Sequence, residues 1–234
     1  MMTTNDLKTL LDSLECKTPP DQIPQKYHPA LIDFLNKEQE WRRQYRLQKL
    51  LSLSGIKPRQ MRTFDKFDWN FNPKIPRQDV LAFRNSDWIS EPKNLVLIGD
   101  AGLGKSHIAK ALCYDAIMGD HRAYFISVYD LISRIKSSRN PDAKINFFGQ
   151  KIKVLCLDEL GYAYHQKQDV DLIFQIISKR SEILPTIITT NLPPKEWGSI
   201  FSGSAASAIL DRLSFNGKFI AIEGRSYRLQ SKIK

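Results

Sequence analysis

The stretch NLVLIGDAGLGKSHIAKALCYDAI, residues 94–117, decides the fold of this chain. Residues 95–98 form a short apolar run with β-branched side chains, which is typical of a buried strand. Residues 99–106 fit the glycine-rich template G-x-x-x-x-G-K-[ST]. From Ile108 to Ala116 the apolar residues recur at helical spacing. The sequence therefore predicts a strand, a glycine loop and a helix in direct succession.

This loop is predicted to bind the phosphates of a nucleotide. Glycines allow backbone N–H groups to turn toward an anion, and the following helix adds the positive end of its dipole. Lys105 is expected to reach the β- and γ-phosphates of ATP, and the Ser106 hydroxyl to ligate Mg²⁺. The alternative, a structural glycine turn, is disfavoured by the strand and helix on either side. The candidate nucleotide contacts are Gly99, Asp100, Ala101, Gly102, Leu103, Gly104, Lys105, Ser106 and His107.

A second apolar run, KVLCLDEL at 153–160, ends in two carboxylates. Ligands of parallel sheets bind at the carboxyl ends of the strands, so we expect Asp158 and Glu159 to lie beside the glycine loop. Asp158 is predicted to hold Mg²⁺ with Ser106, directly or through water. Glu159 is predicted to orient and deprotonate the attacking water. The alternative is a surface turn after a buried strand.

Three later polar residues are candidates for the same site. Asn191 follows the apolar run TIITT at 186–190, and this asparagine or a neighbouring threonine is predicted to hydrogen-bond the attacking water or the γ-phosphate. The alternative is a turn-forming asparagine before Leu-Pro-Pro. Arg212 or Arg228 is predicted to stabilise the charge of a phosphoryl transition state, supplied from a neighbouring subunit. The alternative for both is a salt-bridged surface arginine.

From residue 94 onward, apolar strands alternate with helices. Further strands are predicted at 122–127, 153–158, 186–190 and 218–223, and helices at 128–139, at 169–182 and, as two short pieces, around 194–213. This alternation is typical of a parallel sheet covered by helices on both faces, which is the α/β class.

The predicted organisation has three parts: a helical N-terminal domain at 1–61, an aromatic-rich connector with the first helix of the core at 62–93, and the core at 94–234. The helix predicted at 29–54 mixes aromatic with basic residues. It presents either a solvated face or a contact for nucleic acid or a partner protein. The rings of residues 62–78 either pack on the core or offer a stacking surface for adenine.

The composition indicates a basic globular protein. The chain has 234 residues, of which 42% are hydrophobic, and 35 Lys and Arg against 25 Asp and Glu give a net charge of +10. A polyanionic partner explains this charge, and a merely soluble basic protein is the alternative. No 18-residue apolar run and no signal-peptide pattern occur, so we expect a cytoplasmic protein without a membrane contact. The three cysteines are far apart, and we expect them to be small buried apolar residues.

Residues 38–232 resemble the IstB-type ATP-binding proteins, the helper ATPases of insertion-sequence transposition, which are grouped with the DnaC-type helicase loaders in the AAA+ superfamily. The blocks that carry the resemblance are RTFDKFDW (62–69), NLVLIGDAGLGKSHIAKAL (94–112), VLCLDELGY (154–162), LIFQIISKR (172–180), IITTNLPPKEW (187–197), AILDRL (208–213) and GRSYRL (224–229). The chain departs from the family's pattern in carrying Asp100-Ala101 where two prolines are frequent, Ser106 where Thr is frequent, and a less basic segment at 181–191.

The resemblance implies a parallel-sheet P-loop AAA+ ATPase core that uses ATP and Mg²⁺, preceded by a small helical segment. It also implies the form without a helical lid, because only residues 213–234 follow Arg212. The implied roles are Walker A for Lys105 and Ser106, Walker B for Asp158 and Glu159, sensor 1 for Asn191, a trans-acting arginine finger for Arg212 and a sensor 2 position for Arg228. A neighbouring subunit would have to close the site, so an isolated monomer is expected to hydrolyse ATP slowly.

The expected function is that of an ATPase that assembles as an ATP-bound homo-oligomer on double-stranded DNA and assists a transposase in target selection. The candidate DNA contacts are Arg134, Lys136, Arg139 and Lys144, and the alternative for them is a solvated helix face. A second hypothesis is a loader of a replicative helicase, which would grip the helicase with the first ~60 residues and prefer single strands. A third, a nucleotide-gated module with little turnover, is disfavoured by the two carboxylates at 158–159.

Overall fold

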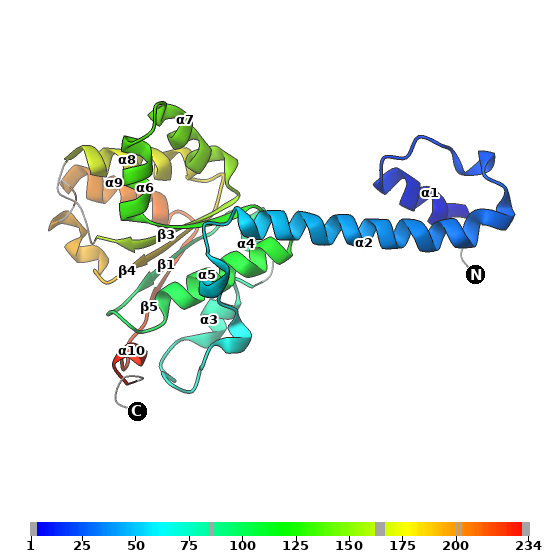
Figure 1. Cartoon of the computed structure of the whole chain (residues 1–234). Coiled ribbons are helices and arrows are strands. Elements are labelled where there is room, and N and C mark those ends of the chain that lie inside the picture. Colours follow the sequence, from blue (N-terminus) through cyan, green and yellow to red (C-terminus); the bar gives the residue numbers. More distant parts are fainter. Residues whose placement is uncertain (1–3, 85–86, 162–166, 200, 202, 231–234) are drawn as a thin grey trace. The chain divides into compact units, whose positions relative to one another are not determined.

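The computed structural model describes residues 4–84, 87–161, 167–199, 201 and 203–230 (Figure 1). The last residue of the VLCLDELGY block, Tyr162, lies outside these residues. The chain forms two compact units, Met1–Lys49 and Leu50–Lys234. This division falls earlier in the chain than the predicted boundary after residue 61.

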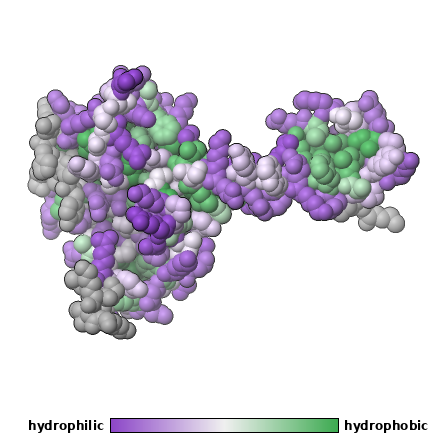
Figure 2. Space-filling model, in the orientation of Figure 1, coloured by the Kyte–Doolittle hydropathy of each residue, from purple (hydrophilic) through white to green (hydrophobic). Residues whose placement is uncertain are grey.

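The first unit contains α1 (Thr4–Ser13) and most of α2 (His28–Ser52), joined by two short 3₁₀ turns, Pro20–Gln22 and Gln25–Tyr27. Leucines of α1 pack against apolar residues of α2, and the buried members are Leu7, Leu11, Leu14, Ile32 and Leu35. Figure 2 shows hydrophobic residues gathered over α1. The apolar side of α1 therefore forms a small core with α2.

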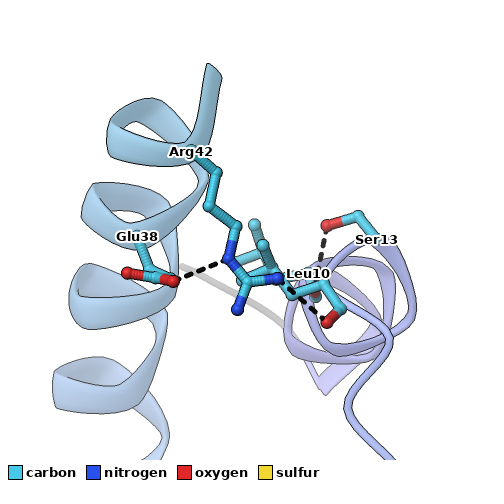
Figure 3. Close-up of polar contacts among 5 residues, drawn as sticks. Leu10, Ser13, Glu38 and Arg42 are labelled. Carbon is cyan, nitrogen blue, oxygen red and sulfur yellow. Dashed lines mark hydrogen bonds and ion pairs between the residues drawn. The ribbon is translucent and has the colours of Figure 1, made fainter. Parts of the chain in front are cut away.

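A polar contact joins the two helices of this unit (Figure 3). The Arg42 guanidinium donates to Glu38 Oε1 at 2.6 Å on α2 and to the carbonyl of Leu14 at 3.4 Å, just beyond α1. The Ser13 hydroxyl donates to the carbonyl of Leu10 at 2.8 Å. These bonds satisfy backbone carbonyls at the C-terminal end of α1.

The second unit is built on five parallel strands. These are β1 (Asn94–Ile98), β2 (Ala123–Ser127), β3 (Val154–Leu160), β4 (Thr186–Thr190) and β5 (Gly217–Ala221), in the order β2-β3-β4-β1-β5. The predicted parallel α/β sheet is confirmed. β1 lies between β4 and β5. The loop that follows β1 lies at the carboxyl edge of the sheet, where α/β sheets bind ligands.

Helices cover both faces of this sheet (Figure 1). One face carries α5 (Lys105–Met118), and the other carries α6 (Val128–Lys136), α8 (Lys167–Arg180) and α9 (Gly203–Ser214). Val96 packs in one buried cluster with α8 and α9, whereas its neighbours Leu95 and Leu97 alternate to the α5 side. Both faces of the strands are therefore apolar, as the continuous apolar runs predict.

The remaining elements are short. They are α3 (Arg77–Leu81), α4 (Asp87–Ser90), α7 (Pro141–Asn146), the π-helical turn Phe147–Lys151, α10 (Tyr227–Gln230), and 3₁₀ turns at Pro58–Gln60, Phe64–Lys66 and Pro194–Ser199. The sequence did not predict α7, although Asn140 before Pro141 is a helix-start signal. Asn140 Oδ1 accepts from the N–H of Ala143 at 3.0 Å, which caps this helix.

Two polar side chains hold the amino edge of the sheet. Arg180, at the end of α8, is 1% exposed, and burial lowers its pKa to about 9. Its guanidinium donates to the carbonyls of Phe148, Ile152, Lys153 and Pro185 and to Thr186 Oγ1. Asn94 accepts from the N–H of Thr186 at 3.0 Å and donates to the carbonyl of Arg212 at 3.3 Å. These bonds fix the starts of β3, β4 and β1.

The expectation for the cysteines is confirmed for Cys113 and Cys156, which are buried, and wrong for Cys16, which is exposed. Cys16 lies just after the end of α1 at Ser13. No helix in the described part of the chain is long and apolar enough to cross a membrane.

Candidate functional site

The glycine loop lies between β1 and α5 and needs glycine at three positions. Gly99, Gly102 and Gly104 have φ angles of 150°, 84° and 97°, which other residues rarely adopt. Gly104 is the N-cap of α5, so the loop ends where the helix dipole is positive. The predicted succession of strand, glycine loop and helix is therefore present.

The side chain of Lys105 hydrogen-bonds back to the first residues of the glycine loop. Its ammonium donates to the carbonyls of Gly99 at 2.5 Å and Asp100 at 2.7 Å. Burial lowers the pKa of Lys105, and the negative charge of Asp158 opposes this shift. The ammonium thus lies between the loop and the end of β3, where an anion can take the place of the two carbonyls.

Asp158 ends up beside Ser106, as the sequence predicts. The Ser106 hydroxyl donates to Asp158 Oδ1 at 2.9 Å, and the Thr189 hydroxyl donates to the same oxygen at 2.5 Å. Asp158 is 8% exposed. The carboxylate is therefore held by one hydroxyl from α5 and one from β4, and Thr189 is a site residue that the sequence did not single out for this contact.

Glu159 leaves the regular strand at a bulge. The pairing of β3 with β4 shifts between Leu157 and Leu160, and Glu159 has a φ of 61°. Its N–H donates to Thr189 Oγ1 at 3.0 Å, which fixes this conformation. A non-glycine residue in the left-handed region inside a strand is strained, and such strain is typical of functional sites. The bulge turns the exposed Glu159 side chain toward the cavity beside the loop.

This cavity has a volume of about 700 Å³, within the usual range of small-ligand sites. Its walls come from the connector, the glycine loop, the ends of β3 and β4, and the C-terminal segment; the lining includes Phe67, Phe71, Lys105, Ser106, Glu159, Asn191 and Arg228. Asn191 Oδ1 is buried and has no hydrogen-bond partner among the described residues. Of the predicted contacts, residues 101–107, Glu159, Asn191 and Arg228 line this cavity, while Asp158 binds Ser106 and the carbonyls of Gly99 and Asp100 bind Lys105. Arg212 and the DNA candidates do not line it.

The connector both packs on the core and lines the cavity. Phe64 is buried and stacks on Trp69, with 5.9 Å between ring centroids. Phe67 meets the His107 ring edge-on at 4.9 Å, and His107 Nε2 lies 3.0 Å from the carbonyl of Thr63. The His107 side chain therefore binds the connector, which leaves its backbone N–H as the predicted phosphate contact.

The family model described as IstB-like ATP binding protein matches residues 8–234. The chain belongs to this family. It is 31% identical over 205 residues, 86% of this chain and 81% of the other, to a protein of Bacillus thuringiensis subsp. berliner named as an ATP-binding protein of insertion sequence IS232. The crystal structure of the DnaC helicase loader matches 66% of this chain and 98% of its own at 27% identity, with a TM-score of 0.53. The crystal structure of DnaI matches 70% of this chain and 89% of its own at 22% identity, with a TM-score of 0.59, which shows the fold alone. The fold of this IstB-like chain is that of the P-loop AAA+ proteins.

Arg212 lies away from the cavity of its own chain. It is in the last turn of α9, and its carbonyl accepts from Asn94 Nδ2 at the amino edge of the sheet. Its guanidinium donates to the carbonyl of Ala208 at 3.0 Å and lies 4.7 Å from the centroid of the Phe174 ring. In this IstB-like chain, Arg212 therefore does not line the cavity beside the glycine loop.

The four candidate DNA contacts differ in their surroundings. Arg134 donates to the Tyr124 hydroxyl at 2.6 Å, and Lys136 forms an ion pair with the buried Asp169 at 2.5 Å. All four residues are exposed. The ion pair offsets the charge of Lys136, whereas Arg134 bonds only a neutral hydroxyl, so Arg134, Arg139 and Lys144 are the better candidates for a phosphate backbone.

The donors beside the loop fit Mg²⁺. In the described residues, no group of three or more His, Cys, Asp and Glu side chains forms a metal site. Mg²⁺ needs no such group, because it binds to one or two protein oxygens together with substrate phosphates and water. Ser106 Oγ and Asp158 Oδ1 are two hard oxygen donors already in contact, so these residues would hold the ion of a bound nucleotide.

Proposed function

We propose that this chain is an ATP-dependent DNA-binding ATPase, which assembles as an ATP-bound homo-oligomer on double-stranded DNA and assists a transposase in target selection. The observation that carries the proposal is that Lys105, Ser106 and Glu159 line one cavity, and that the Ser106 hydroxyl binds the carboxylate of Asp158. Relatives named as ATP-binding proteins of insertion sequences support it.

The residues divide the chemistry of ATP hydrolysis among them. The loop N–H groups and Lys105 bind the phosphates, and the ammonium exchanges the two loop carbonyls for phosphate oxygens. Mg²⁺ held by Ser106 and Asp158 would neutralise phosphate charge. Glu159 accepts a proton from the attacking water, whose oxygen bonds to the γ-phosphorus while the bond to the bridging oxygen of ADP breaks.

Three further residues act on the γ-phosphate in this proposal. Asn191 Oδ1 is a buried acceptor without a partner among the described residues, and it accepts from the attacking water. Arg228 lines the cavity of its own chain and adds positive charge there. Arg212, directed away from its own cavity, stabilises the transition state in the neighbouring subunit.

The substitution Glu159→Gln tests the ATPase assignment. ATP affinity should stay near that of the parent, and turnover should fall by about a hundredfold or more, because general bases contribute ~10²–10⁴. The matched control is Glu182→Gln. Glu182 is also exposed, with a φ of 66°, but lies in the turn before β4 at the opposite edge. Turnover by the Glu159→Gln protein at the parent rate would show that Glu159 is not the base.

A titration of labelled duplex and single-stranded DNA with ATP, ADP or a non-hydrolysable analogue tests the DNA assignment. Duplex of arbitrary sequence should bind in the ATP state, and affinity should fall by about a thousandfold between about 50 and 200 mM salt. The likeness to the DnaC helicase loader favours a second candidate, a loader function. A clear preference for single strands supports the loader, and binding to neither DNA refutes both.

A further inference from the structure

The segment after β5 returns to the glycine loop and lies against it. The N–H of Ile222 donates to the carbonyl of Ile98 at 2.7 Å, and the N–H of Tyr227 donates to the carbonyl of Gly102 at 3.0 Å. We name residues 222–228 the C-terminal strap. Its two backbone bonds reach the last residue before the glycine loop and a residue inside it.

The contact between strap and loop leaves no room for side chains. A Cβ added to Gly99 would overlap the carbonyl oxygen of Ile222, and a Cβ added to Gly102 would overlap the Ser226 hydroxyl. Two glycines of the phosphate-loop template are therefore also contacts of the strap. The conformation of the loop depends on where the strap lies.

A buried asparagine of the connector fixes the strap from its other side. Asn72 is 4% exposed, and both polar atoms of its side chain bind one residue, Arg225. Asn72 Nδ2 donates to the carbonyl of Arg225 at 3.0 Å, and the N–H of Arg225 donates to Asn72 Oδ1 at 2.9 Å. Gly224 has a φ of 142°, and a Cβ there would overlap Asn72 Oδ1. This pair of bonds satisfies a backbone donor and acceptor together, as a β-bridge does.

Aromatic contacts support the same junction. Phe71 and Tyr227 meet edge to face with 5.0 Å between their centroids, and the Arg225 guanidinium lies 5.6 Å from the Phe71 centroid. Phe71, Asn72, Tyr227 and Arg228 also line the cavity. The junction is thus a wall of the site, and Arg228 directly follows its last contact.

We propose that Asn72 is a positioning residue of the nucleotide site: it holds the strap against the glycine loop, so that Arg228 faces the γ-phosphate and the loop keeps its binding conformation. Asn72 acts through Arg225 and the strap. This inference rests on the proposed ATPase function. Without Asn72, the strap and loop must be ordered by the nucleotide itself, which weakens binding.

A buried asparagine can also matter for folding alone, and Asn94 provides the matched control. Asn94 is 7% exposed, and its side chain accepts from the N–H of Thr186 and donates to backbone carbonyls, but it lies at the opposite edge of the sheet. Asn72→Ala and Asn94→Ala each remove a buried amide with backbone partners. Both are expected to lower the thermal midpoint of unfolding, so stability does not distinguish the two positions.

The experiment measures ATP affinity and turnover of the full chain at a temperature at which circular dichroism shows each variant folded. Asn72→Ala should weaken ATP binding by about tenfold or more, and Asn94→Ala by less than about twofold. Asn72→Asp keeps the acceptor for the N–H of Arg225 but loses the donor, so its loss of ATP affinity should be intermediate. If Asn72→Ala does not fold, Asn72→Asp replaces it in the experiment. In turnover at saturating ATP, where the loss of affinity no longer affects the rate, Asn72→Ala combined with Arg228→Ala should equal Arg228→Ala alone, because Asn72 acts on the rate through the same arginine.

Equal losses of ATP affinity in the Asn72→Ala and Asn94→Ala proteins would overturn the inference and leave the proposed function intact. A fully additive loss of turnover in the double variant would also overturn it, since Asn72 and Arg228 would then act independently. If the parent chain binds no ATP at all, the proposed function and this inference fail together.

Discussion

The two edges of the parallel sheet use their polar side chains differently. At the amino edge, the Arg180 guanidinium gives hydrogen bonds to five protein oxygens, and the Asn94 amide joins β1 to β4 and α9. At the carboxyl edge, Asn191 Oδ1 is buried without a partner among the described residues, and Glu159 is exposed at a strained φ. Arg180 and Asn94 at the amino edge thus form hydrogen bonds that stabilise the fold, whereas Asn191 and Glu159 at the carboxyl edge can still bind a ligand.

Backbone strain alone does not make this distinction. Glu182 at the amino edge and Glu159 at the carboxyl edge both have φ near 60°. Glu182 lies in the turn that ends α8, where the left-handed region commonly closes helices, whereas Glu159 interrupts a strand. The decisive difference is what surrounds each residue, because Glu159 lines a cavity together with Lys105 and with Ser106, whose hydroxyl binds Asp158.

Arg212 is an exception to the contrast between a structural amino edge and a functional carboxyl edge, because it lies at the amino edge and is predicted to act in catalysis. Arg212→Ala should bind ATP normally and lose about a thousandfold in turnover, because an arginine supplied in trans contributes ~10³–10⁵. Mixing this variant with Lys105→Ala should restore part of the activity, since each retains what the other lacks. A parent-like rate for Arg212→Ala alone would assign Arg212 to the structural group at that edge.

Arg180 tests whether the polar side chains of the amino edge stabilise the fold without contributing to ATP binding. Arg180→Leu should lower the free energy of unfolding by about 3–5 kcal/mol, because its removal leaves several buried carbonyls without a donor. Chemical denaturation measures this loss. ATP affinity of the folded variant should remain that of the parent. A large loss of affinity without a loss of stability would contradict the assignment.

Thr189 and Thr190 allow a site contact and a structural contact to be compared within one strand, β4. Both are 1% exposed, and the Thr190 hydroxyl bonds the carbonyl of Leu160 at 2.7 Å, whereas the Thr189 hydroxyl bonds Asp158. Thr189→Val and Thr190→Val should each cost about 1 kcal/mol of stability. Only Thr189→Val should raise the Mg²⁺ concentration needed for half-maximal turnover, by about tenfold, because Asp158 loses its orienting donor. Equal Mg²⁺ dependence of the two variants would show that Thr189 does not orient Asp158 for Mg²⁺ binding.

His107 gives the smallest expected effect, a dependence of stability on pH. Burial lowers the pKa of His107, and the charges of Arg62 and Lys110 lower it further, against the hydrogen bond to Thr63. The unfolded chain therefore binds the proton more readily, so stability is fully present above about pH 6.5 and falls as the pH drops toward the folded value. Thermal unfolding at pH 7.5 and 5.5 should show a smaller fall for His107→Gln, which cannot titrate. The pKa of His121 is also lowered by burial, but His121 is common to both proteins. Identical falls would contradict this assignment.

Local patterns in the sequence were sufficient for the sheet and the loop. Apolar runs predicted each strand to within a few residues, and the run at 186–190 coincides with β4. The glycine template and the two carboxylates after 153–157 predicted the contact of Ser106 with Asp158, because parallel topology places both at one edge.

Long-range partners could not be predicted in the same way. Thr189 fits a strand as an ordinary β-branched residue, and nothing near it in sequence shows that its hydroxyl binds Asp158. Asn72 precedes a proline and is typical of a turn, yet its partner Arg225 is 153 residues away. Arg180, in the last turn of a helix, is expected to be solvated, and its burial depends on carbonyls that other segments bring to it.

The central claim is that the carboxyl edge binds the phosphates of ATP through Lys105. Equilibrium titration of ATP against the full chain, with and without Mg²⁺, tests it most directly when repeated with Lys105→Ala and with Lys179→Ala, a change in the last turn of α8, as control. We expect binding that is tighter with Mg²⁺, unchanged in Lys179→Ala and weakened at least about a hundredfold in Lys105→Ala, because the ammonium opposite the β- and γ-phosphates is lost. ATP binding of parent strength by Lys105→Ala would contradict the account.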